Sequence, residues 1–167
     1  MKLLKNKWFI SVLAFFLLLI DGQLSDLLTT LTGRYVFLRV HLLIIFMFLL
    51  LRFLDTDFFA YLLGFILGLI YDSYYLNFIG ITFFMLPILV YLIKRSKKYF
   101  VTPTRSLLAF FLLLVLFEVG CYGLAFLYHL TTYSFLSFVT YQLAETLLLN
   151  VIIFVILDKF VHRNSAK

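Results

Sequence analysis

Three carboxylates stand inside long apolar runs of this sequence, where a charged group is most costly. Glu118 and Glu145 lie near the middle of two such runs, and Asp72 lies near the end of another. An acid at the centre of a bilayer costs about 2.5 to 3.5 kcal/mol to insert, so it must face protein or water and not lipid. Two interpretations stay open for the glutamates: a proton or ligand site, or interhelical hydrogen bonds made by protonated side chains.

The surroundings of the two glutamates bear on both interpretations. Consecutive antiparallel spans would bring Glu118 and Glu145 near one another. Gly120 and Gly123 follow Glu118 closely and predict that another helix packs tightly there.

Asp72 belongs to the stretch GFILGLIYDSYYLNFIG, residues 64–80. Gly64, Gly68 and Asp72 follow one another at intervals of four, which places them on one helix face. Small residues at this spacing let a second helix backbone approach closely in lipid. The stretch therefore predicts a packing face, used either by a hairpin within the chain or by a partner protein.

Two sets of partners are open to the Asp72 carboxylate. It can accept hydrogen bonds from backbone amides at the start of the next apolar run, or it can pair with Arg34 or Arg39. Gly80 would ease the return of the chain after the hairpin turn. Asp21 is a second acid near the end of an apolar run, and Arg39 is a plausible partner for it too.

Other chemistry is poorly represented. Cys121 is the only cysteine, which excludes an intrachain disulfide and a cysteine metal site, and the histidines His41, His129 and His162 show no ligand spacing. The sequence contains no H-E-x-x-H, no G-x-S-x-G and no phosphate-cradling glycine loop. We therefore expect no metal, no cofactor and no catalytic residue.

Composition identifies the elements that must position these side chains. The chain has 167 residues, of which 65% are hydrophobic and 13% are charged. A soluble domain averages about 45 to 50% apolar and about 25% charged residues, so this composition indicates an integral membrane protein. The net charge of +6 comes from short basic clusters between apolar runs and not from one nucleic-acid-binding patch.

A helix needs about 20 apolar residues to cross the hydrocarbon core. Apolar runs of about this length predict an all-α bundle of six spans in a single membrane domain, over residues 8–28, 35–51, 58–75, 78–93, 107–129 and 135–157. Pro87 is expected to kink the fourth span, and Pro103 fits the start of the fifth. Residues 27–34 form the one substantial outer loop of this arrangement.

The distribution of lysine and arginine predicts the orientation. With six spans, one side carries nearly all the basic residues, and the other carries only Arg34 and Arg39. The positive-inside rule then places both termini in the cytoplasm of a cell bounded by this membrane. The first run is followed by DGQLSD, which lacks a signal-peptidase site, so we expect a retained anchor.

The stretch 64–80 resembles a motif of the MreD family, bacterial rod shape-determining membrane proteins. The pattern is G-F-x-x-G-L-x-x-D followed by a later glycine, and its residues here are Gly64, Phe65, Gly68, Leu69, Asp72 and Gly80. The rest of the chain resembles the family in length and in six-span hydropathy.

This resemblance implies a non-enzymatic scaffold of the cell-elongation machinery in the bacterial plasma membrane. Members of the family bind MreC, a single-span protein with a large extracytoplasmic domain. They act with MreB and with the peptidoglycan synthase formed by RodA and a class B penicillin-binding protein. The implied role is to position lateral wall synthesis and so to set an elongated cell shape.

Two other functions compete with this one. The S-component of an energy-coupling-factor vitamin transporter also has about six spans and a similar length. Such components commonly carry A-x-x-x-A in the first span, whereas this chain has Ser11 and Ala14 there. A proton-coupled transporter using Glu118 and Glu145 is the third possibility, and it requires a water-accessible path to both acids.

Overall fold

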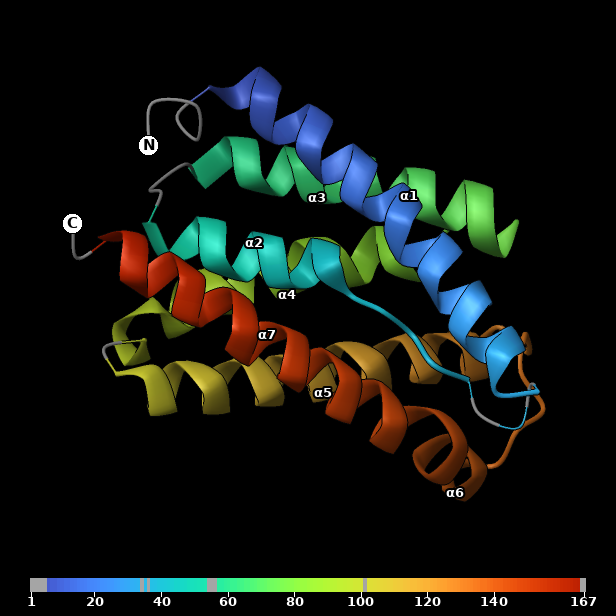
Figure 1. Ribbon diagram of the computed structural model, residues 1–167. Coiled ribbons are helices and arrows are strands. Elements are labelled where there is room, and N and C mark those ends of the chain that lie inside the picture. Colours follow the sequence, from blue (N-terminus) through green and yellow to red (C-terminus); the bar gives the residue numbers. More distant parts are fainter. Residues whose placement is uncertain (1–5, 34, 36, 54–56, 101, 166–167) are drawn as a thin grey trace.

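The computed structural model describes residues 6–33, 35, 37–53, 57–100 and 102–165, and these residues contain helices and connections but no strand. The helices run alongside one another in a bundle (Figure 1). In chain order the elements are α1 (Lys7–Leu31), α2 (Leu42–Phe53), α3 (Asp57–Tyr71), the π-helical turn η2 (Asp72–Leu76), α4 (Thr82–Ser96), the short 3₁₀ turn η3 (Lys97–Tyr99), α5 (Pro103–Leu127), α6 (Phe135–Phe138), the π-helical turn η4 (Val139–Leu143) and α7 (Ala144–Ser165).

Three stretches of the described chain are long and apolar enough to cross a membrane: Lys7–Leu31, Phe58–Leu76 and Pro103–Leu127. The outward faces of the helices carry large apolar side chains. On α5, Leu108, Leu112 and Leu116 recur every four residues and are each about half exposed. A stripe of this kind suits contact with lipid tails, because no water-compatible surface is presented.

The centre of the bundle is α2, which contacts α1, α4 and α7. Its side chains from Leu43 to Leu51 are mostly buried, as expected for a helix that is apolar on every side. Phe48 packs edge-on against Phe110 and Phe154, whose rings stack on each other at 4.3 Å. This aromatic cluster joins α2, α5 and α7.

The two prolines and the expected outer loop can be compared with the sequence analysis. Helix α5 begins at Pro103, and the Thr102 side chain accepts a hydrogen bond from the Arg105 amide. Helix α4 continues through Pro87. Helix α1 extends to Leu31, so most of the range expected as an outer loop is helical; Arg34 lies outside the described residues.

The largest difference concerns the range 35–51, which was expected to be one helix. Residues 37–41 are extended, and helix α2 begins only at Leu42. The segment contains Phe37, Leu38 and Val40 and leads directly into an apolar run, and hydropathy alone does not show where in such a stretch a helix begins. The extended segment is stabilised by polar side chains from two neighbouring helices, described below.

Candidate functional site

The Asp72 carboxylate caps the start of α4. It is fully buried and accepts hydrogen bonds from the backbone amides of Gly80, Ile81, Thr82 and Phe83, at 2.8 to 3.0 Å. A carboxylate that accepts several amides at a helix N-terminus is favoured both by charge-assisted hydrogen bonds and by the helix dipole. Of the two sets of Asp72 partners that the sequence left open, the backbone amides are the ones that bind the carboxylate in the structure.

The glycines of the same motif differ in how closely α4 approaches them. A Cβ atom added at Gly68 would lie 2.7 Å from the Phe83 Cα and from the Thr82 carbonyl oxygen. A Cβ added at Gly64 would make only ordinary contacts, at 3.5 Å or more. Gly80 has a φ of +133°, a conformation that favours glycine. Gly68 is therefore the point of closest approach between α3 and α4.

The apolar members of the motif are partly exposed, and the Phe65 ring lies at the edge of the α4 contact, 5.3 Å between centroids from the Phe83 ring. Phe65 and Leu69 are 40% and 41% exposed. They alternate along α3 with the glycines that face α4, so the motif divides into an inner and an outer face. The inner face holds the hairpin together, and the outer face is open to lipid or to another protein.

The extended segment 37–41 is held on one side by α1. The Asp21 carboxylate is buried and accepts hydrogen bonds from the amides of Leu42 and Leu43, at 2.7 and 2.9 Å. One turn later, the Ser25 hydroxyl accepts from the Val40 amide at 2.9 Å. Asp21 thus caps α2 and does not pair with Arg39, contrary to one expectation from the sequence.

On its other side the segment is held by α7. The Arg39 amide donates to Thr146 Oγ1 at 3.2 Å, and the His41 amide donates to Asn150 Oδ1 at 2.8 Å. Asn150 Nδ2 donates back to the Arg39 carbonyl oxygen at 2.7 Å. Successive residues of the segment bond to α1 and α7 alternately, as the two-residue repeat of extended backbone requires.

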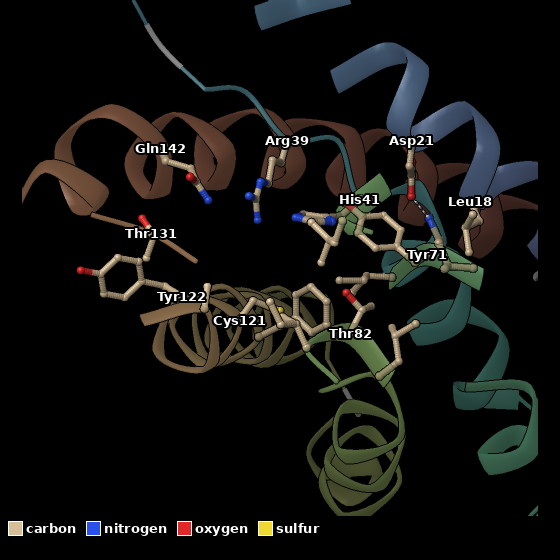
Figure 2. Close-up of a pocket in the computed structure, with 17 residues that line it drawn as sticks. Leu18, Asp21, Arg39, His41, Tyr71, Thr82, Cys121, Tyr122, Thr131 and Gln142 are labelled. Atoms are coloured by element: carbon tan, nitrogen blue, oxygen red, sulfur yellow. Dashed lines mark hydrogen bonds between the residues drawn. The ribbon is translucent and has the colours of Figure 1, made fainter. Parts of the chain in front are cut away.

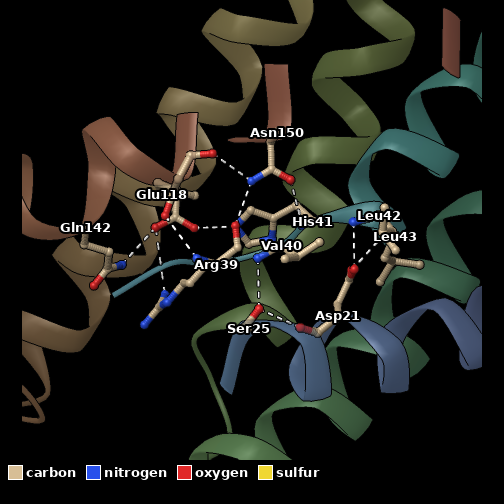
Figure 3. Close-up of polar contacts among 11 residues, drawn as sticks. Asp21, Ser25, Arg39, Val40, His41, Leu42, Leu43, Glu118, Gln142 and Asn150 are labelled. Carbon is tan, nitrogen blue, oxygen red and sulfur yellow. Dashed lines mark hydrogen bonds and ion pairs between the residues drawn. The ribbon is translucent and has the colours of Figure 1, made fainter. Parts of the chain in front are cut away.

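Glu118 lies where this segment meets α5, and it is fully buried (Figure 3). His41 Nε2 lies 2.5 Å from Glu118 Oε1, and Gln142 Nε2 donates to Glu118 Oε2 at 3.1 Å. The Arg39 guanidinium forms a longer ion pair with the same carboxylate, at 3.8 Å. The extended segment therefore supplies two side-chain partners, His41 and Arg39, of an acid on another helix.

Glu145 is not one of the Glu118 partners. It is half-buried on α7, whereas Glu118 pairs with the extended segment and with η4. The two glutamates do not form the joint site considered from the sequence. The glycines near Glu118 also differ: Met85 packs against Gly120, whereas Gly123 has open space beside it. Close packing was correctly expected at Gly120 and wrongly at Gly123.

A cavity of about 120 Å³ lies beside Glu118. Figure 2 shows Arg39, His41, Gln142, Tyr71 and Thr82 around this cavity. Leu18, Ile44 and Leu86 belong to its apolar lining. In the described residues no group of three or more His, Cys, Asp or Glu side chains is placed to hold a metal ion.

A second ion pair lies at the opposite end of the bundle. Arg52 Nη1 lies 3.1 Å from Asp158 Oδ1, and both side chains are about nine-tenths buried. Arg52 also donates to the Phe100 carbonyl oxygen at 3.1 Å. The pair joins the end of α2 to α7 and to the connection between α4 and α5, a role that the sequence analysis did not assign to either residue.

Comparison with known proteins agrees with the motif. A family model described as rod shape-determining protein MreD matches residues 4–163. The chain is 36% identical over 154 residues to the cell shape-determining protein MreD of Streptococcus pneumoniae (strain ATCC BAA-255 / R6), covering 90% of each chain. No solved structure matches.

Proposed function

We propose a function from the fact that the chain belongs to the MreD family of rod shape-determining proteins. The protein is a non-enzymatic scaffold of the cell-elongation machinery in the bacterial plasma membrane. It binds MreC and helps to position lateral peptidoglycan synthesis. The comparisons give no support to the alternative of a vitamin-transporter S-component.

The proposed topology has six spans with both ends of the chain in the cytoplasm. It is supported by the ends of the helices: the start of α1, the end of α2, the end of α4, the start of α5 and the end of α7 lie at one end of the bundle (Figure 1). Most of the described basic residues lie at these helix ends: Lys7, Arg52, Lys94, Arg95, Lys97, Lys98, Arg105 and Lys159. Arg39 lies in the opposite half of the bundle. The positive-inside rule favours the cytoplasm for this end.

The observation that carries the proposal of partner binding is the division of the motif. The inner residues fix the hairpin, and the outer residues continue as an apolar face on α3, which we call the outer α3 face: Leu62, Phe65, Ile66 and Leu69, each 40 to 47% exposed. Their spacing of three and four residues forms one stripe along the helix. The single transmembrane helix of MreC is an occupant of suitable shape for such a stripe.

The remaining partners follow from this arrangement. MreC bound at the outer α3 face would place its extracytoplasmic domain beside RodA and the class B penicillin-binding protein. The basic end between α4 and α5 would face MreB or the anionic cytoplasmic leaflet. In this proposal the protein acts by holding these components together and not by a chemical step.

Co-purification from mild detergent tests the outer α3 face. A Phe65→Ala and Leu69→Ala double variant is expected to recover about tenfold less MreC than wild type, because truncating aromatic and large apolar anchors commonly removes 1 to 2 kcal/mol of binding energy. Leu108→Ala with Leu112→Ala on α5 is the matched control, since these side chains are also exposed. Full recovery of MreC by the α3 variant would contradict the proposed docking face.

A further inference from the structure

The cavity beside Glu118 contains hydrogen-bond donors that the protein itself does not use. A guanidinium carries five donors, yet the Arg39 side chain forms no hydrogen bond with the described residues. Its contact is the ion pair with Glu118 at 3.8 Å, which exceeds hydrogen-bond distance. Figure 2 shows the Arg39 guanidinium beside the cavity, and 40% of its side chain is exposed.

Two hydroxyl groups on the cavity wall are also available. Within the described part of the chain, neither the Tyr71 nor the Thr82 hydroxyl has a hydrogen-bond partner. Both residues line the cavity, and both hydroxyl oxygens are accessible to a water-sized probe, because every inaccessible side-chain oxygen in the described chain has a partner. Buried polar groups normally find partners, so hydroxyls and a guanidinium together at one cavity point to a ligand that accepts hydrogen bonds.

The acids at and beside the cavity are engaged by other groups of the protein. The Glu118 carboxylate is paired with His41 and accepts a hydrogen bond from Gln142. The Asp21 carboxylate is occupied by the two amides at the start of α2. Both acids therefore have partners, and Arg39 is the one lysine or arginine among the lining residues, with its hydrogen-bond donors unused by the described residues.

The volume sets the size of the group. A cavity of about 150 Å³ holds a molecule such as benzene, so about 120 Å³ accepts a group of roughly five or six heavy atoms. A phosphate group has this size, and guanidinium groups bind it through paired hydrogen bonds. We propose that this cavity binds a phosphate group, with Arg39, Tyr71 and Thr82 as donors. The apolar lining at Leu18, Ile44 and Leu86 allows the phosphate to belong to a lipid head group or to be free in solution.

Titration of the purified full-length protein tests this site. The probes are inorganic phosphate, dihexanoyl-phosphatidylglycerol and, as a control without phosphate, dihexanoylglycerol, and the readouts are heat of binding and melting temperature. The critical variant is Tyr71→Phe, which removes a hydroxyl that bonds to no described residue and so is expected to keep the melting temperature without ligand. It should weaken phosphate binding about tenfold, as expected for a lost hydrogen bond to a charged group. Tyr91→Phe on the exposed face of α4 is the matched control.

Each outcome decides the proposal. Binding of phosphatidylglycerol alone, weakened by Tyr71→Phe, assigns the site to a lipid head group. Binding of inorganic phosphate with the same weakening assigns it to a free anion. In both cases Arg39→Gln abolishes binding. The proposal is overturned if neither probe binds, if dihexanoylglycerol binds as well as the phospholipid, or if Tyr71→Phe binds as tightly as wild type.

Discussion

Gly68 and Gly64 share one helix face but should respond oppositely to the same substitution. In Gly68→Ala the new Cβ would lie 2.7 Å from backbone atoms of Thr82 and Phe83, whereas ordinary contact begins near 3.4 Å. Backbone atoms cannot rotate away, so α3 and α4 must separate locally by about 0.7 Å. Inserting a methyl group into a packed interface of this kind costs about 1 to 3 kcal/mol.

The separation would also reach the Asp72 cap. The hydrogen bonds from Gly80 to Phe83 measure 2.8 to 3.0 Å, and lengthening them by a similar amount takes them past the usual limit. Gly64→Ala has no such cost, because its Cβ finds ordinary contacts. Alanine is also favoured over glycine in a helix by about 0.5 to 1 kcal/mol. We therefore expect Gly64→Ala to be neutral or slightly stabilising.

Thermal unfolding in one detergent, followed by the loss of the monodisperse peak on size exclusion, measures both variants. A change of 1 kcal/mol shifts the melting temperature of a chain of this size by about 2 to 4 °C. Gly68→Ala is therefore expected to melt about 2 to 12 °C below wild type, and Gly64→Ala at or just above it. Equal melting temperatures for the two variants would refute the assignment of Gly68 as the point of closest approach.

Three further substitutions test the polar interior by the same melting assay. Asp72→Asn should lower the free energy of unfolding by at least about 1 to 3 kcal/mol, because the Asn side chain cannot accept hydrogen bonds from all the backbone amides that the carboxylate binds. The control Asp26→Asn, at an exposed position, should leave the melting temperature unchanged. Arg52→Gln should destabilise by about 3 to 5 kcal/mol because it leaves Asp158 buried without this partner, and adding Asp158→Asn should recover part of the loss. Asn150→Leu should destabilise by at least about 1 to 3 kcal/mol by removing partners of the extended backbone, and an unchanged melting temperature would show that the segment does not depend on α7.

The hairpin of α3 and α4 could be anticipated from the sequence because the residues that form it lie close together along the chain. Gly64, Gly68 and Asp72 lie within nine residues, so helical geometry alone fixes their common face. The amides that Asp72 accepts lie only eight to eleven residues further along the chain. A short connection between two apolar runs leaves few other places for them. Spacing and chain length together were enough to place this arrangement among the alternatives that the sequence left open.

The polar centre was not accessible in the same way. His41 and Glu118 are 77 residues apart, and their meeting depends on which helices are neighbours. A single sequence does not determine that order. The start of α2 was misplaced because residues 37–41, although they include Arg39 and His41, lead without a break into the apolar run of α2. The sequence did contain a pattern that indicates the helices bonding to this segment. Asp21 and Ser25 lie four residues apart on α1, as do Thr146 and Asn150 on α7, so each pair shares one polar helix face.

Two of the buried acids, Asp21 and Asp72, share one role, which Glu118 does not have. Asp21 at the end of α1 caps α2, and Asp72 at the end of α3 caps α4, so each offsets the desolvation of its charge with backbone amides of the next helix. Such bonds are part of the fold, because irregular backbone inside a membrane needs protein partners. Glu118 instead bonds to side chains, and one of these, Arg39, faces a cavity with donors to spare. A fold that needed only stability would have no reason to leave these donors unused, so the polar centre around Glu118 is where we expect function beyond scaffolding.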